Sequence, residues 1–114
     1  MVWTIKYSET ALKALKKLDK AIVREVIDYL NDKIARREDA TTAGKALSGT
    51  LAKYWRYRVR DMRAICYIDK GEVTILILQV GHRSGVYDDE AKIASQAADA
   101  VETLQNEKSE KDQP

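Results

Sequence analysis

Residues 54–80 read YWRYRVRDMRAICYIDKGEVTILILQV, and this stretch decides the fold. From Tyr54 to Arg60 aromatic or aliphatic residues alternate with arginines, which is the pattern of a strand with one apolar and one charged face. A second strand is predicted from about Met62 to Asp69, and the nearly continuous β-branched run Val73 to Val80 is typical of a central strand covered on both faces. Lys70-Gly71 predicts a two-residue hairpin turn in which glycine supplies the positive φ.

The sequence predicts helices both before and after these strands. Residues 2–7 alternate as a short opening strand, and two apolar stripes at helical spacing then predict a helical hairpin whose N-caps are Ser8 and Asp19. Another apolar stripe, with acidic residues in its first turn, predicts a helix over residues 88–104. The order β-α-α-β-β-β-α predicts an α+β fold with a small, largely antiparallel sheet of about four strands, one face packed on helices and the other free.

Length and composition predict one domain, residues 1–104, followed by a polar tail without fixed structure, residues 105–114. Of the 114 residues 45% are hydrophobic and 33% charged, which suffices for a core and a charged surface. The single cysteine, Cys66, is expected in the core and forms no disulfide framework. No apolar run reaches the ~20 residues of a membrane span, so we expect a cytoplasmic protein without a membrane partner. We therefore do not expect a membrane protein, a disulfide-rich secreted domain, a zinc module or a multi-domain enzyme.

Charge is unevenly distributed along the chain although the net charge is only +2. Residues 1–87 hold 17 Lys+Arg against 10 Asp+Glu, whereas residues 88–114 hold 3 against 8. Between Lys45 and Arg63 six basic residues accompany one acidic residue, Asp61. Such clustering is typical of a surface that binds a polyanion, and a solvated strand face is the alternative.

The alternation of the first arginine-rich strand places its arginines in a row about 6 to 7 Å apart, where their like charges repel unless an anion lies over them. If the next strand lies between this one and the strand ending near Val80, further groups converge on the same patch. The converging set is Arg56, Arg58, Arg60, Arg63, Arg83 and Tyr87.

This set suits a phosphodiester, because guanidinium groups bind phosphate bidentately and a tyrosine can relay a proton or stack on a base. The sequence offers no carboxylate cluster for Mg²⁺, no histidine pair, no glycine-rich phosphate loop and no Ser-His-Asp set. A nuclease built from these residues is therefore expected to use no metal or other cofactor and to use the RNA 2′-OH as its nucleophile.

Other residues near the patch have both a functional and a purely structural interpretation. His82, the sole histidine, is either an acid/base group or an ordinary strand residue. Tyr54 shares the arginine side of its strand and can stack on a base, whereas Trp55 and Tyr57 are expected in the core. The residues expected to attract or bind substrate are Lys45, Lys53, Tyr54, Arg60 and His82.

Three segments together carry a resemblance to a known family: ALKALKKLDKAIVREVIDYL (11–30), KALSGTLAKYWRYRVRDMRAICYI (45–68) and above all VGHRSGVY (80–87). They resemble the RelE branch of the RelE/ParE superfamily, the toxins of bacterial toxin–antitoxin pairs, over nearly the whole chain. The resemblance implies a RelE-like fold and ribosome-dependent cleavage of mRNA by 2′-OH attack. It also implies a RelB-like antitoxin, with the toxin a monomer alone and part of a hetero-oligomer with its antitoxin.

The resemblance further assigns roles by motif. Arg63 and Arg83 correspond to residues that hold and neutralise the scissile phosphate, and Tyr87 to one that stacks on or orients the substrate. Arg56 and Arg58 occupy two basic positions that are often lysines in the family; because an arginine is a poor general base, the base stays open. The alternatives are a ParE-like inhibitor of DNA gyrase without catalysis, and an inactive relative that only binds its antitoxin.

Overall fold

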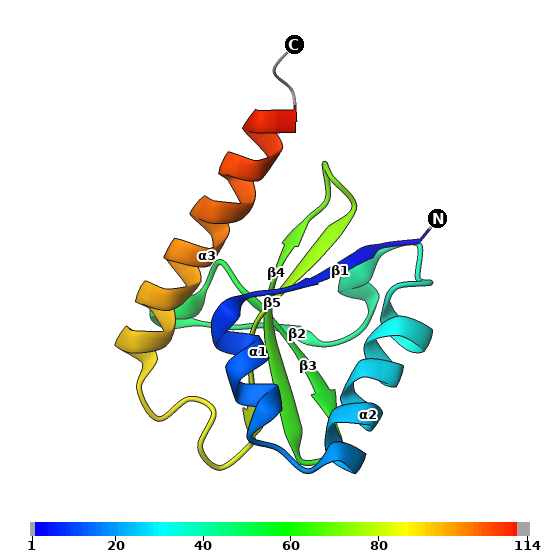
Figure 1. Ribbon diagram of the computed structural model, residues 1–114, viewed down its shortest axis with the longest axis vertical. Coiled ribbons are helices and arrows are strands. Elements are labelled where there is room, and N and C mark those ends of the chain that lie inside the picture. Colours follow the sequence, from blue (N-terminus) through cyan, green and yellow to red (C-terminus); the bar gives the residue numbers. More distant parts are fainter. Residues whose placement is uncertain (1, 112–114) are drawn as a thin grey trace.

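The computed structural model describes the backbone of residues 2–111 and the side chains of residues 2–107, and it is a five-stranded sheet with helices on both faces (Figure 1). Short helical turns, one of them π-helical at Leu30–Ile34, connect the main elements. In chain order the main elements are β1 (Thr4–Tyr7), α1 (Glu9–Lys16), α2 (Lys20–Tyr29), β2 (Lys45–Ala46), β3 (Trp55–Val59), β4 (Met62–Asp69), β5 (Thr74–His82) and α3 (Glu90–Lys111).

The helical hairpin forms as the sequence predicts, and both predicted N-caps are confirmed. The Ser8 Oγ accepts a hydrogen bond from the Ala11 N–H at 3.1 Å, and the Asp19 carboxylate accepts one from the Ala21 N–H at 2.9 Å. The apolar stripe of α2 continues through the π-helical turn Leu30–Ile34, where the Ala35 N–H donates to the Leu30 carbonyl. This wider turn keeps Leu30 and Ile34 fully buried.

The strands lie in the order β1-β5-β4-β3-β2, so β4 separates β3 from β5 as the convergence argument requires. The three central strands are antiparallel, and β1 runs parallel to β5. The expected number of about four strands omitted β2, a two-residue strand at the edge of the sheet. Nothing in so short a stretch distinguishes it from the loop that the sequence predicted.

Two core clusters lie on opposite faces of the sheet. On the hairpin face, Val26 and Leu30 pack with Tyr57 and Cys66, which confirms the predicted core positions of the last two. The opposite face, here called the arginine face, carries Arg56, Arg58 and Arg63. The expectation that this second face is free was wrong, because Ile93, Ala97 and Leu104 of α3 cover Ile65, Leu76 and Leu78 there. Burying these strand residues under a helix removes apolar surface from water.

Two local expectations also need correction or extension. The hairpin between β4 and β5 is a four-residue connection rather than the two-residue turn at Lys70-Gly71, and its positive φ of 51° belongs to Val73, not to glycine. Helix α3 ends at Lys111, later than its apolar stripe predicted, and the rest of the predicted tail, 112–114, lies outside the described residues. Within the described part of the chain, no helix combines the length and apolarity needed to cross a membrane.

Candidate phosphate-binding site

Arg63 lies at the centre of the arginine face and is almost completely buried, with 6% of its surface exposed. Its Nη1 donates to the carbonyls of Arg60 and Met62, each at 2.9 Å, so the turn backbone fixes the guanidinium. Burial is the main reason that the pKa of Arg63 lies below its ordinary value, and the positive charges of Arg58 and Arg56 act in the same direction. The Arg63 guanidinium is therefore a cation that is held in a fixed position and largely shielded from water.

The sheet register brings two more arginines beside Arg63. Arg58 is its direct partner across the β3–β4 pair and is exposed, and Arg56 lies opposite Ile65 on the same face. The Nε of Arg56 is buried and has no hydrogen-bond partner. Lys45 of β2 is the partner of Arg56, so this predicted residue also joins the arginine face. Like charges at neighbouring positions of a sheet repel, which makes this patch a strong attractor of anions.

The segment after β5 folds back over the sheet and packs closely on Gly81. A Cβ at Gly81, which is the partner of Arg63 in the β4–β5 pair, would lie 3.2 Å from the Val86 side chain. Val86 is buried at this position, and its N–H donates to the His82 carbonyl at 2.9 Å. Packing of Val86 on Gly81 thereby brings the next residue, Tyr87, to the arginine face.

Tyr87 and Arg83 are both within electrostatic reach of Arg63, as the convergence argument predicted. Arg83 lowers the pKa of Arg63 further, whereas Tyr87 acts in the opposite direction. The hydroxyl of Tyr87 is buried without a hydrogen-bond partner. The Nε of Arg83 lies 3.6 Å from the Asp61 carboxylate, and its backbone N–H donates to the Asp61 carbonyl at 2.7 Å.

Arg60 does not extend the row that strand alternation predicted. Strand β3 ends at Val59, and Arg60 adopts a positive φ of 55° in the turn. Its Nε pairs at 3.0 Å with Glu25 of α2, the helix on the opposite face of the sheet. The row of strand arginines therefore consists of Arg56 and Arg58, because the turn conformation directs the third side chain elsewhere.

The structure also places the other residues that the sequence predicted for the site. Tyr54 is 8% exposed and packs in the cluster under α3; burial, and then Tyr67, raises its pKa. Lys53 is exposed in the turn before β3. His82 lines a different cleft, between α1 and the start of α3, where its Nδ1 accepts from the Ser84 N–H at 3.1 Å. The structure therefore places His82 in a different cleft from the arginines and buries Tyr54 in the core under α3.

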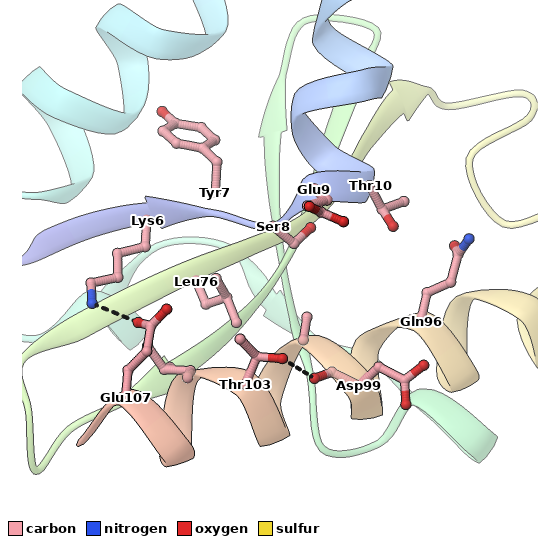
Figure 2. A pocket seen from close by; sticks show the side chains of 12 residues that line it. Lys6, Tyr7, Ser8, Glu9, Thr10, Leu76, Gln96, Asp99, Thr103 and Glu107 are labelled. Atoms are coloured by element: carbon pink, nitrogen blue, oxygen red, sulfur yellow. Dashed lines mark hydrogen bonds and ion pairs between the residues drawn. The ribbon is translucent and has the colours of Figure 1, made fainter. Parts of the chain in front are cut away.

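A second groove, between β1 and α3, has about 580 Å³ of volume and the opposite electrostatic character (Figure 2). It is lined by the carboxylates of Glu9, Asp99 and Glu107 with Lys6 as their one cation, and Lys6 pairs with Glu107 at 3.4 Å. Such a groove repels phosphate, so it is a poorer candidate for a polyanion than the arginine face.

Sequence reasoning missed three residues that shape the site. Asp61, which pairs with Arg83, appeared only as the single acidic residue of a basic stretch. Gly81 and Val86 set the position of Tyr87, and the one signal for them was an apolar residue within a short polar run. Among the described residues, no group of three or more His, Cys, Asp or Glu side chains is arranged to hold a metal ion.

Comparison with known proteins agrees with the fold. Residues 5–87 match the family model described as the ParE toxin of the type II toxin–antitoxin system parDE. The chain is 30% identical over 87 residues, 76% of its length, to the toxin RelG of Mycobacterium tuberculosis, of which the match covers 98%.

Solved structures give the same result. The toxin–antitoxin complex RelBE2 of M. tuberculosis contains a chain that matches with a TM-score of 0.68 and 28% identity, covering 74% of this chain and 94% of that one. A chain of the RelE–RelB complex of Pyrococcus horikoshii matches with a TM-score of 0.52 and 25% identity, covering 75% and 99% respectively. The chain therefore belongs to the RelE/ParE superfamily of type II toxins.

Proposed function

We propose that this toxin is a metal-independent endoribonuclease that cleaves mRNA on the ribosome, and that an antitoxin neutralises it. The observation that carries the proposal is the group of arginines around the buried Arg63, together with two buried polar atoms that have no partner, the Arg56 Nε and the Tyr87 hydroxyl. Buried polar groups are normally hydrogen-bonded, so unpartnered ones beside a cationic patch favour a ligand with phosphate oxygens.

In the proposed reaction the 2′-oxygen of the RNA attacks the adjacent phosphorus and the bond from phosphorus to the 5′-oxygen breaks. Arg63 and Arg83 hold the nonbridging oxygens and neutralise the charge that develops on the phosphorane. The Tyr87 hydroxyl supplies the proton that the departing 5′-oxygen needs. Arg56 and Arg58 stay protonated, so their part is electrostatic, and the 2′-OH proton leaves to a base outside this set. The products are a 2′,3′-cyclic phosphate and a 5′-hydroxyl.

The antitoxin in this proposal is carried over from the relatives, whereas ribosome dependence is our own expectation. The RelE-type chains of M. tuberculosis and P. horikoshii were solved as complexes with antitoxins, and we extend that partnership to this toxin. A toxin of this size with an exposed basic face has little surface to select a message by sequence, so we expect the ribosome to present the substrate in the cytoplasm.

The test is induced expression in a bacterium followed by primer extension on a translated message, beside the same message without its start codon. We expect cuts on the translated message only, with downstream fragments that carry a 5′-hydroxyl and accept phosphate from polynucleotide kinase without prior phosphatase. An Arg83→Ala variant should give no cuts. Downstream fragments that carry a 5′-phosphate contradict the 2′-OH mechanism.

The second candidate is a ParE-like inhibitor of DNA gyrase, and the match to the ParE toxin model favours it. Arrest of growth with DNA damage and intact messages supports this alternative. Absence of any arrest indicates an inactive toxin that only binds its antitoxin.

A further inference from the structure

The turn between β3 and β4 accepts hydrogen bonds from both arginines that the proposed reaction assigns to the phosphate. The turn consists of Arg60 and Asp61, and β4 begins directly after it at Met62. The carbonyls of Arg60 and Met62 accept hydrogen bonds from the Arg63 guanidinium, each at 2.9 Å. The carbonyl between them, that of Asp61, accepts from the Arg83 N–H at 2.7 Å. Three successive carbonyls therefore hold the Arg63 side chain and the Arg83 backbone.

The Asp61 side chain makes a second contact with Arg83. Its Oδ1 lies 3.6 Å from the Arg83 Nε, and the side chains of both residues are more than half exposed, 67% for Asp61 and 61% for Arg83. An ion pair with this exposure adds little to the stability of a fold, because water and salt screen it. The backbone hydrogen bond already fixes where the Arg83 side chain starts, so the carboxylate acts mainly on the direction in which the guanidinium points.

The ion pair involves one edge of the Arg83 guanidinium and leaves the other edge available. A guanidinium has five N–H donors, one at Nε and two at each Nη. The carboxylate lies beside Nε, and within the described part of the chain no residue accepts a hydrogen bond from the Nη atoms of Arg83. Two Nη atoms side by side match two oxygens of one phosphate, which they bind bidentately.

We propose that Asp61 is a positioning residue for Arg83, an inference that rests on the proposed function. Its carboxylate holds the Nε edge of the guanidinium, and the Nη edge is thereby presented to the nonbridging oxygens of the scissile phosphate. When the RNA covers the site and excludes water, the effective dielectric constant falls and the ion pair strengthens. Asp61 itself contacts neither the reacting atoms nor the substrate, and it acts only through Arg83.

The same carboxylate lowers the positive charge of the arginine face. Asp61 is the single acidic residue between Lys45 and Arg63, and its charge repels the phosphates of RNA. Removal of this charge therefore leaves the binding of RNA unchanged or makes it tighter, while the misdirected Arg83 slows the chemical step. A residue that only supported the fold, or only bound the substrate, would not separate binding from chemistry in this way.

The experiment compares the parent with Asp61→Asn and Asp61→Glu. The control is Asp32→Asn, which removes the same charge from an exposed residue in the π-helical turn after α2. Cleavage is measured in single-turnover reactions with the toxin in excess over ribosomes that hold a defined codon in the A site. Titration of the toxin gives the maximal rate and the toxin concentration at half of that rate. Urea unfolding establishes that each variant folds.

We expect the maximal rate of Asp61→Asn to fall about tenfold, at a half-saturating toxin concentration equal to or below that of the parent. Asp61→Glu keeps a carboxylate within reach of Arg83 and should recover to within about threefold of the parent rate, and Asp32→Asn should match the parent. A maximal rate of Asp61→Asn within about twofold of the parent overturns the inference. So does an equal loss in Asp61→Glu, or a half-saturating concentration that rises as much as the rate falls.

A measurement on the free chain separates this inference from the proposed function. In the isotope-labelled protein, the NMR signal of the Arg83 Nε–H is identified by its loss in Arg83→Lys. We expect Asp61→Asn to shift this signal and to lower its order parameter, and Asp32→Asn to leave it unchanged. If the parent does not cleave mRNA, the proposed function fails, while a shifted signal still supports the positioning of Arg83. A signal that Asp61→Asn leaves unchanged overturns the inference.

Discussion

Replacement of Arg63 by methionine separates the binding of phosphate from the stability of the fold. The substitution keeps an unbranched chain of similar length and removes the buried positive charge. Two charge-assisted hydrogen bonds to backbone carbonyls are lost, each worth about 1.5 to 3 kcal/mol. The repulsion from Arg58, the direct cross-strand partner, also disappears; for two charges about 5 to 7 Å apart at an effective dielectric constant of about 20, such a repulsion amounts to about 2 to 3 kcal/mol.

Arg63 is 6% exposed, so burying its charge costs free energy of desolvation. The methionine variant avoids this cost, which stabilises the fold in the same direction as the lost repulsion. The opposing contributions nearly cancel, so we expect the free energy of unfolding of Arg63→Met to lie within about 1.5 kcal/mol of the parent value. Cleavage should fall about 100-fold or more, because a preorganised group that stabilises transition-state charge contributes about 3 to 4 kcal/mol.

The assay combines urea unfolding, followed by tryptophan fluorescence, with a single-turnover cleavage reaction on ribosomes that hold a defined codon in the A site. Arg36→Met, which removes an exposed arginine outside the site, is the control and should retain full activity. Cleavage by Arg63→Met within about threefold of the parent rate refutes the assignment of Arg63 to the phosphate. A loss of stability above about 3 kcal/mol shows instead that its hydrogen bonds to the turn are its main role.

Two further predictions follow from the packing and from a titrating group. Gly81→Ala places a methyl group 3.2 Å from Val86, so we expect a loss of about 1 to 3 kcal/mol in urea unfolding and a larger relative loss of cleavage, because the segment carrying Tyr87 moves; a variant with parental cleavage contradicts the positioning argument. Hydrogen bonds from the Thr41 hydroxyl and N–H, and then Lys70, hold the pKa of Asp39 below its ordinary value. The lowered pKa stabilises the fold above about pH 4, and this contribution is lost as pH falls through the folded-state pKa. The free energies of unfolding of Asp39→Asn and of the parent, measured as a function of pH, should therefore converge as the pH falls below about 4. A difference that stays constant across the pH range argues against this linkage.

Much of the local structure is readable from residue patterns. Ser8 and Asp19 cap the helices as predicted, and β4 begins and ends where the sequence placed it, at Met62 and Asp69. These features depend on interactions within a few residues, which is why one sequence suffices to find them. The arginine face was predictable for the same reason, since alternation along β3 assigns Arg56 and Arg58 to one side.

The sequence could not place the third arginine of that row. Alternation continues formally to Arg60, but the turn gives this residue a positive φ and Glu25 of α2 attracts its side chain. Likewise, strand alternation assigns Tyr54 to the side of the arginines, yet Tyr54 is buried. The reason is that α3, which begins more than thirty residues later in the chain, covers this part of the sheet. Such contacts depend on which face a distant helix covers, and periodicity contains no information on that choice.

By itself, therefore, the sequence determined the main helices and the longer strands, the caps, the charged strand and the family of this toxin. Tertiary structure decided what surrounds the charge: the burial of Arg63, the packing of Val86 on Gly81 that brings Tyr87 to the same face, and the separation of His82 into another cleft. The physical reason is that hydrogen-bond periodicity and side-chain direction are local properties of the backbone. Burial and convergence arise only when segments far apart in the chain exclude water from the same surface.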